Sequence, residues 1–233
     1  MADLLRRAGR AFDQLLFPRA ATCMGCGDQS GCAQDWVCDE CVEALAKLWC
    51  GGAPLPCVPP IERLFSAYFY RDPVAALVQA LKYGSVGKLS EPMGRAMAEA
   101  CACLSLPDAT LVVPAPMHPR RERHRGYNQA ELLSQEVARR LGCAHARALK
   151  KVRNTRQQAR LDHAARAENL KGSVAVCEDV RGRTVLLVDD VYTTGATMRV
   201  CAEALLAAGA ALVYGLTYAF AGHVRKNGGE RQR

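Results

Sequence analysis

The sequence lacks a long apolar run. Half of its 233 residues are hydrophobic, yet no run reaches the roughly 18 apolar residues that a membrane-spanning helix needs. Residues 1–21 mix leucine and phenylalanine with arginine, as in a short amphipathic helix, and they lack the continuous apolar segment of a signal peptide. We therefore predict a cytoplasmic protein whose first residues dock as a helix on its own core rather than on a membrane.

Glycine-rich nucleotide-binding motifs are also absent. The segment GSVGKLS at 84–90 resembles a P-loop, but Lys82 stands where the first glycine of that motif should fall, and Leu89 replaces the required serine or threonine. No G-x-G-x-x-G segment follows an expected strand. These absences exclude a P-loop nucleotidase and a typical dinucleotide-binding domain.

Acidic and aromatic residues are comparatively few. The chain has 31 lysines and arginines against 23 acidic residues, a net charge of +8, which suits an anionic partner such as nucleic acid or a phosphorylated metabolite. A generic solvated basic surface is the alternative. Arginines concentrate at 118–126 and 146–160, where Tyr127 is the nearby aromatic residue. Because single-strand binding needs stacking partners as well as positive charge, we predict only sequence-independent phosphate contacts there.

Cysteine, in contrast, is abundant, with twelve residues. In a chain without a signal peptide we expect these thiols to be reduced or metal-bound rather than in disulfides. Two C-x-x-C pairs near the N-terminus predict a structural zinc site, formed by Cys23, Cys26, Cys38 and Cys41. Scattered buried cysteines and a redox C-x-x-C are the alternatives, and Cys50 and Cys57 are left over. We expect the cysteines in apolar stretches to be small core residues: Cys101, Cys103, Cys143, Cys177 and Cys201.

A linker rich in proline and glycine at 51–60 divides the chain. We predict an N-terminal helix and cysteine-rich zinc module over residues 1–57, a larger domain over 61–222, and a basic, disordered tail over 223–233.

The larger domain alternates strand and helix patterns. Apolar runs predict strands at 64–70, 110–116, 184–190 and 211–220, and amphipathic runs predict helices at 73–83, 90–104, 128–142 and 196–209. Asn128 suits the N-cap of its helix, with Glu131 three residues on. Near-continuous apolar strands that alternate with helices predict an α/β fold, a parallel sheet flanked by helices on both faces.

The segment VLLVDDVYTTGATM at 185–198 carries the clearest chemistry. Asp189 and Asp190 end an expected buried strand, and ligands of open parallel sheets bind beyond the carboxyl ends of the strands. Adjacent carboxylates repel, a cost that ribose hydroxyls or a phosphate-borne Mg²⁺ would offset. The next residues offer three hydroxyls, a glycine for close approach and a helix N-terminus that favours an anion. This combination predicts a site for a 5-phosphorylated ribose, with an acidic turn that caps a helix as the simpler alternative.

The same segment closely resembles the phosphoribosyl diphosphate (PRPP) binding motif of type I phosphoribosyltransferases. The resemblance extends over nearly the whole chain to one subfamily, the ComF competence-protein family. The matching segments are VVPAPMHPRRERHRGYNQA at 112–130, LKY at 81–83, and the spaced residues R, T, Q, L, R and N over 153–169. Many members carry further C-x-x-C pairs where this chain has single cysteines, Cys50 and Cys57, which leaves room for one zinc ion.

The resemblance implies a type I phosphoribosyltransferase-like fold and a role for each matching residue. Asp189 and Asp190 would be the catalytic pair that holds the ribose hydroxyls and metal-bound water. The PRPP-binding set would be Asp189, Asp190, Tyr192, Thr193, Thr194, Gly195, Ala196 and Thr197. The pyrophosphate loop would comprise Ala115, Pro116 and Met117. Lid and anion contacts would come from Lys82, Arg125, Asn128, Gln129, Arg153, Thr155, Gln158, Arg166 and Asn169.

The polar composition of 153–169 independently suits a mobile lid. Its arginines would stabilise charge on a diphosphate leaving group, with a solvated face as the alternative.

Three functions stay open at this point. The family's implied role is in natural transformation, where the protein would bind PRPP and Mg²⁺ and handle imported single-stranded DNA together with proteins of the DNA-uptake machinery; phosphoribosyl transfer to an unknown acceptor would be an additional activity. A metabolic phosphoribosyltransferase of the purine-salvage or amidotransferase type is the second. The third is an adaptor whose zinc module docks a partner while the larger domain senses PRPP. We favour the first, which rests on resemblance alone.

Overall fold

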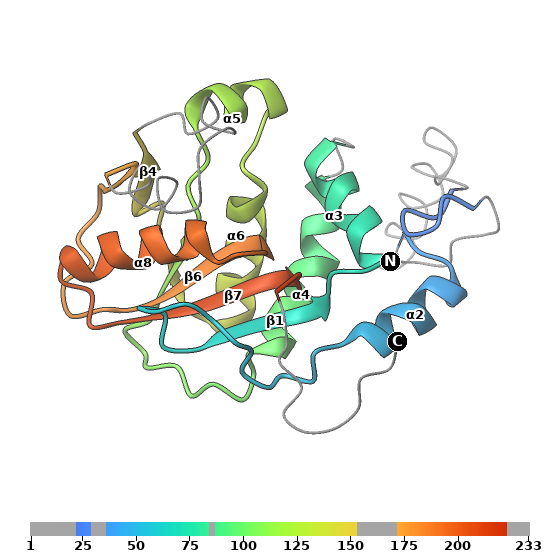
Figure 1. The fold of residues 1–233 in the computed structure, drawn as a ribbon, viewed down its shortest axis with the longest axis horizontal. Coiled ribbons are helices and arrows are strands. Elements are labelled where there is room, and N and C mark those ends of the chain that lie inside the picture. Colours follow the sequence, from blue (N-terminus) through green and yellow to red (C-terminus); the bar gives the residue numbers. More distant parts are fainter. Residues whose placement is uncertain (1–21, 29–35, 84–86, 153–171, 223–233) are drawn as a thin grey trace, which may run out of the picture.

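The computed structural model describes residues 22–28, 36–83, 87–152 and 172–222 (Figure 1). In chain order the elements are α2 (Asp39–Leu48), β1 (Leu64–Phe69), α3 (Val74–Tyr83), the 3-10 helix η1 (Gly87–Leu89), α4 (Ser90–Ala100), β2 (Leu111–Pro114), α5 (Pro119–Arg125), α6 (Gln129–Leu141), β3 (Ala144–His145), β4 (Leu149–Lys151), β5 (Val174–Val176), β6 (Thr184–Tyr192), α8 (Ala196–Ala207) and β7 (Leu212–Phe220).

Five strands form one sheet in the order β1-β7-β6-β2-β3, and every neighbouring pair is parallel. The predicted fold class is therefore confirmed. The short strands β4 and β5 form a separate antiparallel pair.

The sheet is buried on both faces, which explains its continuous apolar strands. In β6, Leu186 and Val188 face the cluster built with α3, α4 and α6. Val185 and Leu187 face the second cluster, built with α8 and the β4–β5 pair. Figure 1 shows α8 on the opposite side of the sheet from α4 and α6.

The order of the strands creates a switch point between β2 and β6. The chain leaves β2 through α5 and α6 towards β3 at one edge, and it leaves β6 through α8 towards β7 in the opposite direction. Because the two connections diverge on opposite faces, they leave a crevice at the carboxyl ends of these strands, which is where open α/β sheets bind ligands.

The cysteine-rich module packs directly on the larger domain. Cys23, Cys38 and Cys41 belong to the same core cluster as α3 and α4. Isolated bridges also join Trp49 to Tyr68 and Leu55 to Leu64. In Figure 1, α2 lies beside α3 near the β1 edge of the sheet.

Several local predictions can be compared with the structure. Asn128 caps α6 as predicted, since its side chain accepts a hydrogen bond from the backbone N–H of Ala130. Glu131 instead pairs with Arg147 at 3.1 Å. Cys101 and Cys201 are buried as predicted, but the expectation was wrong for Cys103 and Cys177, which are exposed, and Cys143 is only partly buried. The predicted N-terminal helix, the lid at 153–169 and the tail lie outside the described residues.

Within the described part of the chain, no helix has both the length and the apolar character needed to cross a bilayer.

Candidate functional site

A cavity of about 380 Å³ opens at the switch point between β2 and β6. Its walls come from the end of α3, the loop after β2, α5, the start of α6, β4, the end of β6 and the start of α8. The lining residues are Lys82, Tyr83, Ala115, Pro116, Met117, His118, Arg121, Arg125, Asn128, Gln129, Lys151, Asp189, Asp190, Val191, Thr193 and Thr197.

The two aspartates lie inside β6 rather than beyond its end. β6 pairs with β2 only as far as Val188, and it continues beside β7 to Tyr192. Successive side chains of a strand point to opposite faces, yet the two carboxylates stay close enough for Asp190 to act on the pKa of Asp189, and both residues line the cavity.

Asp190 faces the α3 side of the sheet. Its Oδ2 lies 2.5 Å from the Lys82 Nζ, and both side chains are largely buried, with 7% and 21% of their surface exposed. Among the described residues, no donor forms a hydrogen bond of regular geometry with this Oδ2, so its polar contact is the ion pair with Lys82. Lys82, in the last turn of α3, thus neutralises one of the two adjacent charges.

Asp189 faces the α8 side. Burial and then the neighbouring Asp190 carboxylate raise the pKa of Asp189 well above its usual range. Its Oδ1 accepts a hydrogen bond from the Asp190 N–H at 2.8 Å. A cavity ligand that donates hydroxyl hydrogens or carries positive charge would favour the ionised form.

Carboxylates are the ligand type that Mg²⁺ prefers. The exposed part of Asp189 and the incompletely satisfied Oδ2 of Asp190 therefore fit a Mg²⁺ ion that arrives with a phosphate ligand.

The turn from β6 into α8 places two hydroxyls at the cavity. Thr193 and Thr197 line it, whereas the Thr194 hydroxyl accepts a hydrogen bond from the Ala196 N–H at 3.4 Å. Gly195 has φ 73°, and a side chain there would collide with Tyr192. Tyr192 itself packs away from the cavity, stacked on Phe220, so its side chain supports the turn instead of lining the site.

The loop after β2 forms the opposite wall. Its first residue, Ala115, donates its N–H to the Val188 carbonyl at 2.7 Å. The Ala115 carbonyl in turn accepts a hydrogen bond from the Asn128 Nδ2 at 3.0 Å. Because Asn128 is buried and also caps α6, one side chain fixes both the loop and the helix start. Pro116, Met117 and Gln129 line the cavity as well.

Four cationic side chains converge on this space: Lys82, Arg121, Arg125 and Lys151. Sequence reasoning named Lys82 and Arg125 as anion contacts but missed the other two cations, together with Tyr83 and Val191. Burial lowers the pKa of Lys151, and Arg121 adds to that effect, so an anion between these two cations would be stabilised. Arg153, Thr155, Gln158, Arg166 and Asn169 lie outside the described residues.

A second candidate site lies in the N-terminal module. The Sγ atoms of Cys23, Cys26, Cys38 and Cys41 all lie within 4.8 Å of one another. Two of the separations are 3.6 Å and 3.8 Å, close to the ~3.8 Å edge of a tetrahedron whose Zn–S bonds are about 2.3 Å. This donor set forms a structural metal site that fits zinc. Among the described residues the other cysteines do not join it.

Backbone groups prepare the first cysteine for metal binding. The N–H groups of Gly25 and Cys38 point at the Cys23 Sγ, at 3.3 Å and 3.2 Å. Burial opposes ionisation of Cys23, but backbone hydrogen bonds from Cys26, Cys38 and Gly25 outweigh it and lower the pKa of this thiol to about 6. Only glycine fits at 25, because a Cβ there would lie 2.8 Å from the Cys41 Sγ.

Comparison with known proteins agrees with this architecture. The phosphoribosyl transferase domain family matches residues 128–227. The DNA utilization protein YhgH of Salmonella typhi is 34% identical over 199 residues, which cover 76% of this chain and 87% of that protein. Competence protein F of Haemophilus influenzae is 30% identical over 200 residues, covering 76% and 86%.

The chain is also similar to competence protein ComFC of Bacillus subtilis, with 32% identity over 104 residues, which cover 43% of this chain and 40% of that protein. With its four-cysteine module and phosphoribosyltransferase domain, this chain belongs to the ComF family.

Proposed function

We propose that this protein binds PRPP, accompanied by Mg²⁺, in the cavity between β2 and β6, and that it acts in the cytoplasm in the uptake or handling of imported single-stranded DNA during natural transformation. The cavity is the observation that carries the first part. It brings the two carboxylates of β6, two threonine hydroxyls and four cations around one space. A ribose with phosphate groups at both ends needs this mixture of acceptors, donors and positive charge.

The arrangement supports a role for each wall. Asp189 and Asp190 would accept hydrogen bonds from the ribose hydroxyls, and Thr193 and Thr197 at the N-terminus of α8 would bind the 5-phosphate. The diphosphate would lie against the loop 115–117, with Arg121 and Lys151 nearby. If transfer occurs, a nucleophile would attack the anomeric carbon as its bond to the diphosphate breaks. The carboxylates would stabilise positive charge on the ring, and the cations would stabilise the departing diphosphate.

The DNA part rests on the relatives and on charge. Two relatives carry competence in their names, and another carries DNA utilization. The helix α5 has the sequence PRRERHR and no buried residue, and its Arg120, Arg123 and His124 are exposed to solvent outside the cavity. Such a surface supports contacts with the phosphates of a single strand.

We further propose that zinc occupies the four-cysteine site as a structural ion. The sulfur spacing supports this metal, and the site joins the module to the core cluster beside α3. Its role would be to hold the module against the larger domain.

Calorimetric titration of PRPP with Mg²⁺ tests the central proposal. Wild-type protein should show saturable binding, and an Asp189→Asn, Asp190→Asn double variant should lose it. Asp179→Asn is the matched control, because Asp179 is exposed, pairs with Arg181 and does not line the cavity. The absence of binding by folded, metal-loaded wild type would contradict the proposal. Release of pyrophosphate only after a candidate acceptor is added to the same samples would identify a transferase that moves the phosphoribosyl group to that acceptor.

A further inference from the structure

Tyr83 stands exposed at the wall of the cavity. It is the last residue of α3 and keeps 72% of its surface in solvent, more than any other large hydrophobic side chain that the structure describes. A single exposed aromatic side chain is common on protein surfaces. Tyr83, however, lies at the wall of the cavity proposed to bind PRPP, and its neighbours indicate what its ring could contact.

The nearest of these neighbours is Arg125, from the end of α5. Its guanidinium carbon lies 5.0 Å from the centroid of the Tyr83 ring, a cation–π distance. The same guanidinium donates from Nη1 to the Gln129 Oε1 at 2.6 Å, and Gln129 is buried. Arg125 is therefore anchored at one end while it lies over the ring.

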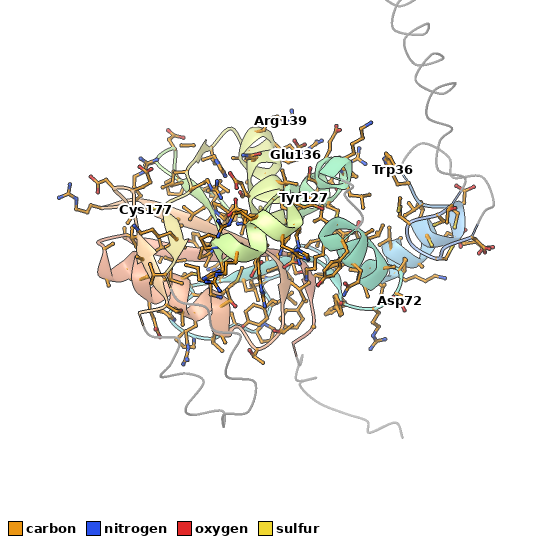
Figure 2. All side chains as sticks on the ribbon, turned by 90° about the horizontal axis from the view of Figure 1, so that it is seen from above. Trp36, Asp72, Tyr127, Glu136, Arg139 and Cys177 are labelled. Carbon is orange, nitrogen blue, oxygen red and sulfur yellow. The ribbon has the colours of Figure 1, made fainter. Side chains whose placement is uncertain are left out.

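A second contact fixes the spacing between the two elements. The Tyr127 hydroxyl, in the turn between α5 and α6, donates a hydrogen bond to the carbonyl of Leu81 in α3, and Figure 2 shows Tyr127 where these elements meet. Leu81 is fully buried. The turn after α5 is thus tied to α3, which brings Arg125 at the end of α5 close to Tyr83 at the end of α3.

An exposed ring beside an anchored arginine suits a nucleobase and its phosphate. Bases stack on aromatic side chains without regard to sequence, and arginine contributes both cation–π and phosphate contacts. The rest of α5 adds Arg120 and Arg123, which are exposed and do not line the cavity. Exposed cations on the same helix as Arg125 would contact further phosphates of a strand, so we take a strand rather than a free nucleotide as the ligand.

We propose that Tyr83 and Arg125 form a base-stacking platform for single-stranded nucleic acid at the mouth of the cavity. The inference rests on the DNA part of the proposed function and names the residues that carry it. Sequence reasoning found only Tyr127 near the arginines. The fold uses the hydroxyl of Tyr127 to tie α3 to the turn and brings Tyr83, distant in the sequence, to the arginines instead.

Binding of a fluorescein-labelled oligothymidine, followed by anisotropy at several salt concentrations, tests the platform. Tyr83→Ala should weaken binding by about 5- to 150-fold, the range for loss of one stacked base. The dependence of affinity on salt should stay unchanged, because no phosphate contact is lost. Tyr83→Phe should restore nearly the wild-type affinity, since the ring is retained. Arg123→Ala, in contrast, should lower the salt slope by about 0.7.

Val42→Ala is the matched control, because Val42 is also exposed but lies on α2 and does not line the cavity. Tyr83→Trp supplies a second readout that does not depend on a truncated side chain. Its added fluorescence should be quenched by the oligonucleotide, with the same midpoint as the anisotropy.

Each contrary result has a distinct meaning. Wild-type affinity in Tyr83→Ala, or an unquenched Tyr83→Trp, would overturn the platform and leave the DNA part of the proposed function standing. Equal affinity of the wild type for free thymidine monophosphate and for the strand would overturn the preference for a strand. A wild type that binds no oligonucleotide would overturn the platform and the DNA part together, while PRPP binding is judged separately by calorimetry.

Discussion

Replacing Asp189 by asparagine should stabilise the fold at neutral pH. Burial and the adjacent Asp190 carboxylate both raise the pKa of Asp189, so the folded protein holds this charge at a cost. Asparagine keeps the Oδ1 that accepts the Asp190 N–H, and it removes the charge. The residue that the proposed ligand needs is thus one that the unliganded fold disfavours.

The expected gain in the free energy of unfolding is about 1–3 kcal/mol, the range for an incompletely compensated buried polar group. For a chain of this size, each kcal/mol shifts the melting temperature by about 2–4 °C. A rise in melting temperature of about 2–12 °C follows.

The gain should depend on pH in a defined direction. The pKa of Asp189 is higher in the folded state than the unfolded value of about 3.9, so wild-type stability declines as pH rises from the unfolded towards the folded pKa. The advantage of Asp189→Asn should be complete above the folded pKa. It should shrink as pH falls and disappear below the unfolded pKa.

Asp190→Asn provides an adjacent control with the opposite sign. It leaves the largely buried Lys82 Nζ without the carboxylate 2.5 Å away. The free energy of unfolding should fall by about 1–3 kcal/mol, less than for a fully buried pair, because Lys82 keeps some solvent contact. Urea denaturation of both variants across pH measures these differences. If Asp189→Asn lowers the unfolding free energy at neutral pH, or keeps its advantage undiminished in acid, the electrostatic account of the pair is wrong.

Two further predictions concern the metal site and the loop after β2. Removing the metal with a chelator should lower the melting temperature by about 10 °C or more, because three of the four cysteines belong to the core cluster beside α3. Cys26→Ser should lose bound zinc in a colorimetric zinc assay. Cys177→Ser should keep it, because Cys177 lies at the far end of the molecule from Trp36 in the module (Figure 2). An unchanged melting temperature after complete chelation would contradict a structural role. Asn128→Ala should lower the free energy of unfolding by about 1–3 kcal/mol and weaken PRPP binding, because it removes both the α6 cap and the hydrogen bond to the Ala115 carbonyl. Asn128→Asp should recover the cap but not the bond to the Ala115 carbonyl, so thermal stability should recover more than affinity in calorimetry, and equal losses in the two variants would show that the cap contributes nothing.

Much of the fold could be predicted because its signals are local. Continuous apolar strands alternating with amphipathic helices require a parallel sheet covered on both faces, and β6 shows that burial directly. The two C-x-x-C pairs likewise allowed few interpretations other than a four-sulfur metal site, and the structure brings the four sulfur atoms together.

Other elements carry no such signal. The helix α5 has no buried residue, so hydrophobic periodicity could not indicate it. It is held by polar contacts, with Pro119 in its first turn, His118 as its cap and an ion pair between Glu122 and Arg147 at 2.5 Å. Exposed and buried cysteines also look alike in sequence, which is why Cys103 and Cys177 were placed wrongly.

The sequence by itself determined the fold class, the four sulfur ligands and the strand on which the aspartate pair lies. Only the tertiary structure decided what surrounds that pair. Tyr83 comes from the end of α3, Arg121 from α5 and Lys151 from β4, and Lys82, which the family resemblance had named as an anion contact, pairs with Asp190. The physical reason is that strand order and the diverging connections at the switch point place these side chains around one cavity, and neither is written in the local pattern of any segment.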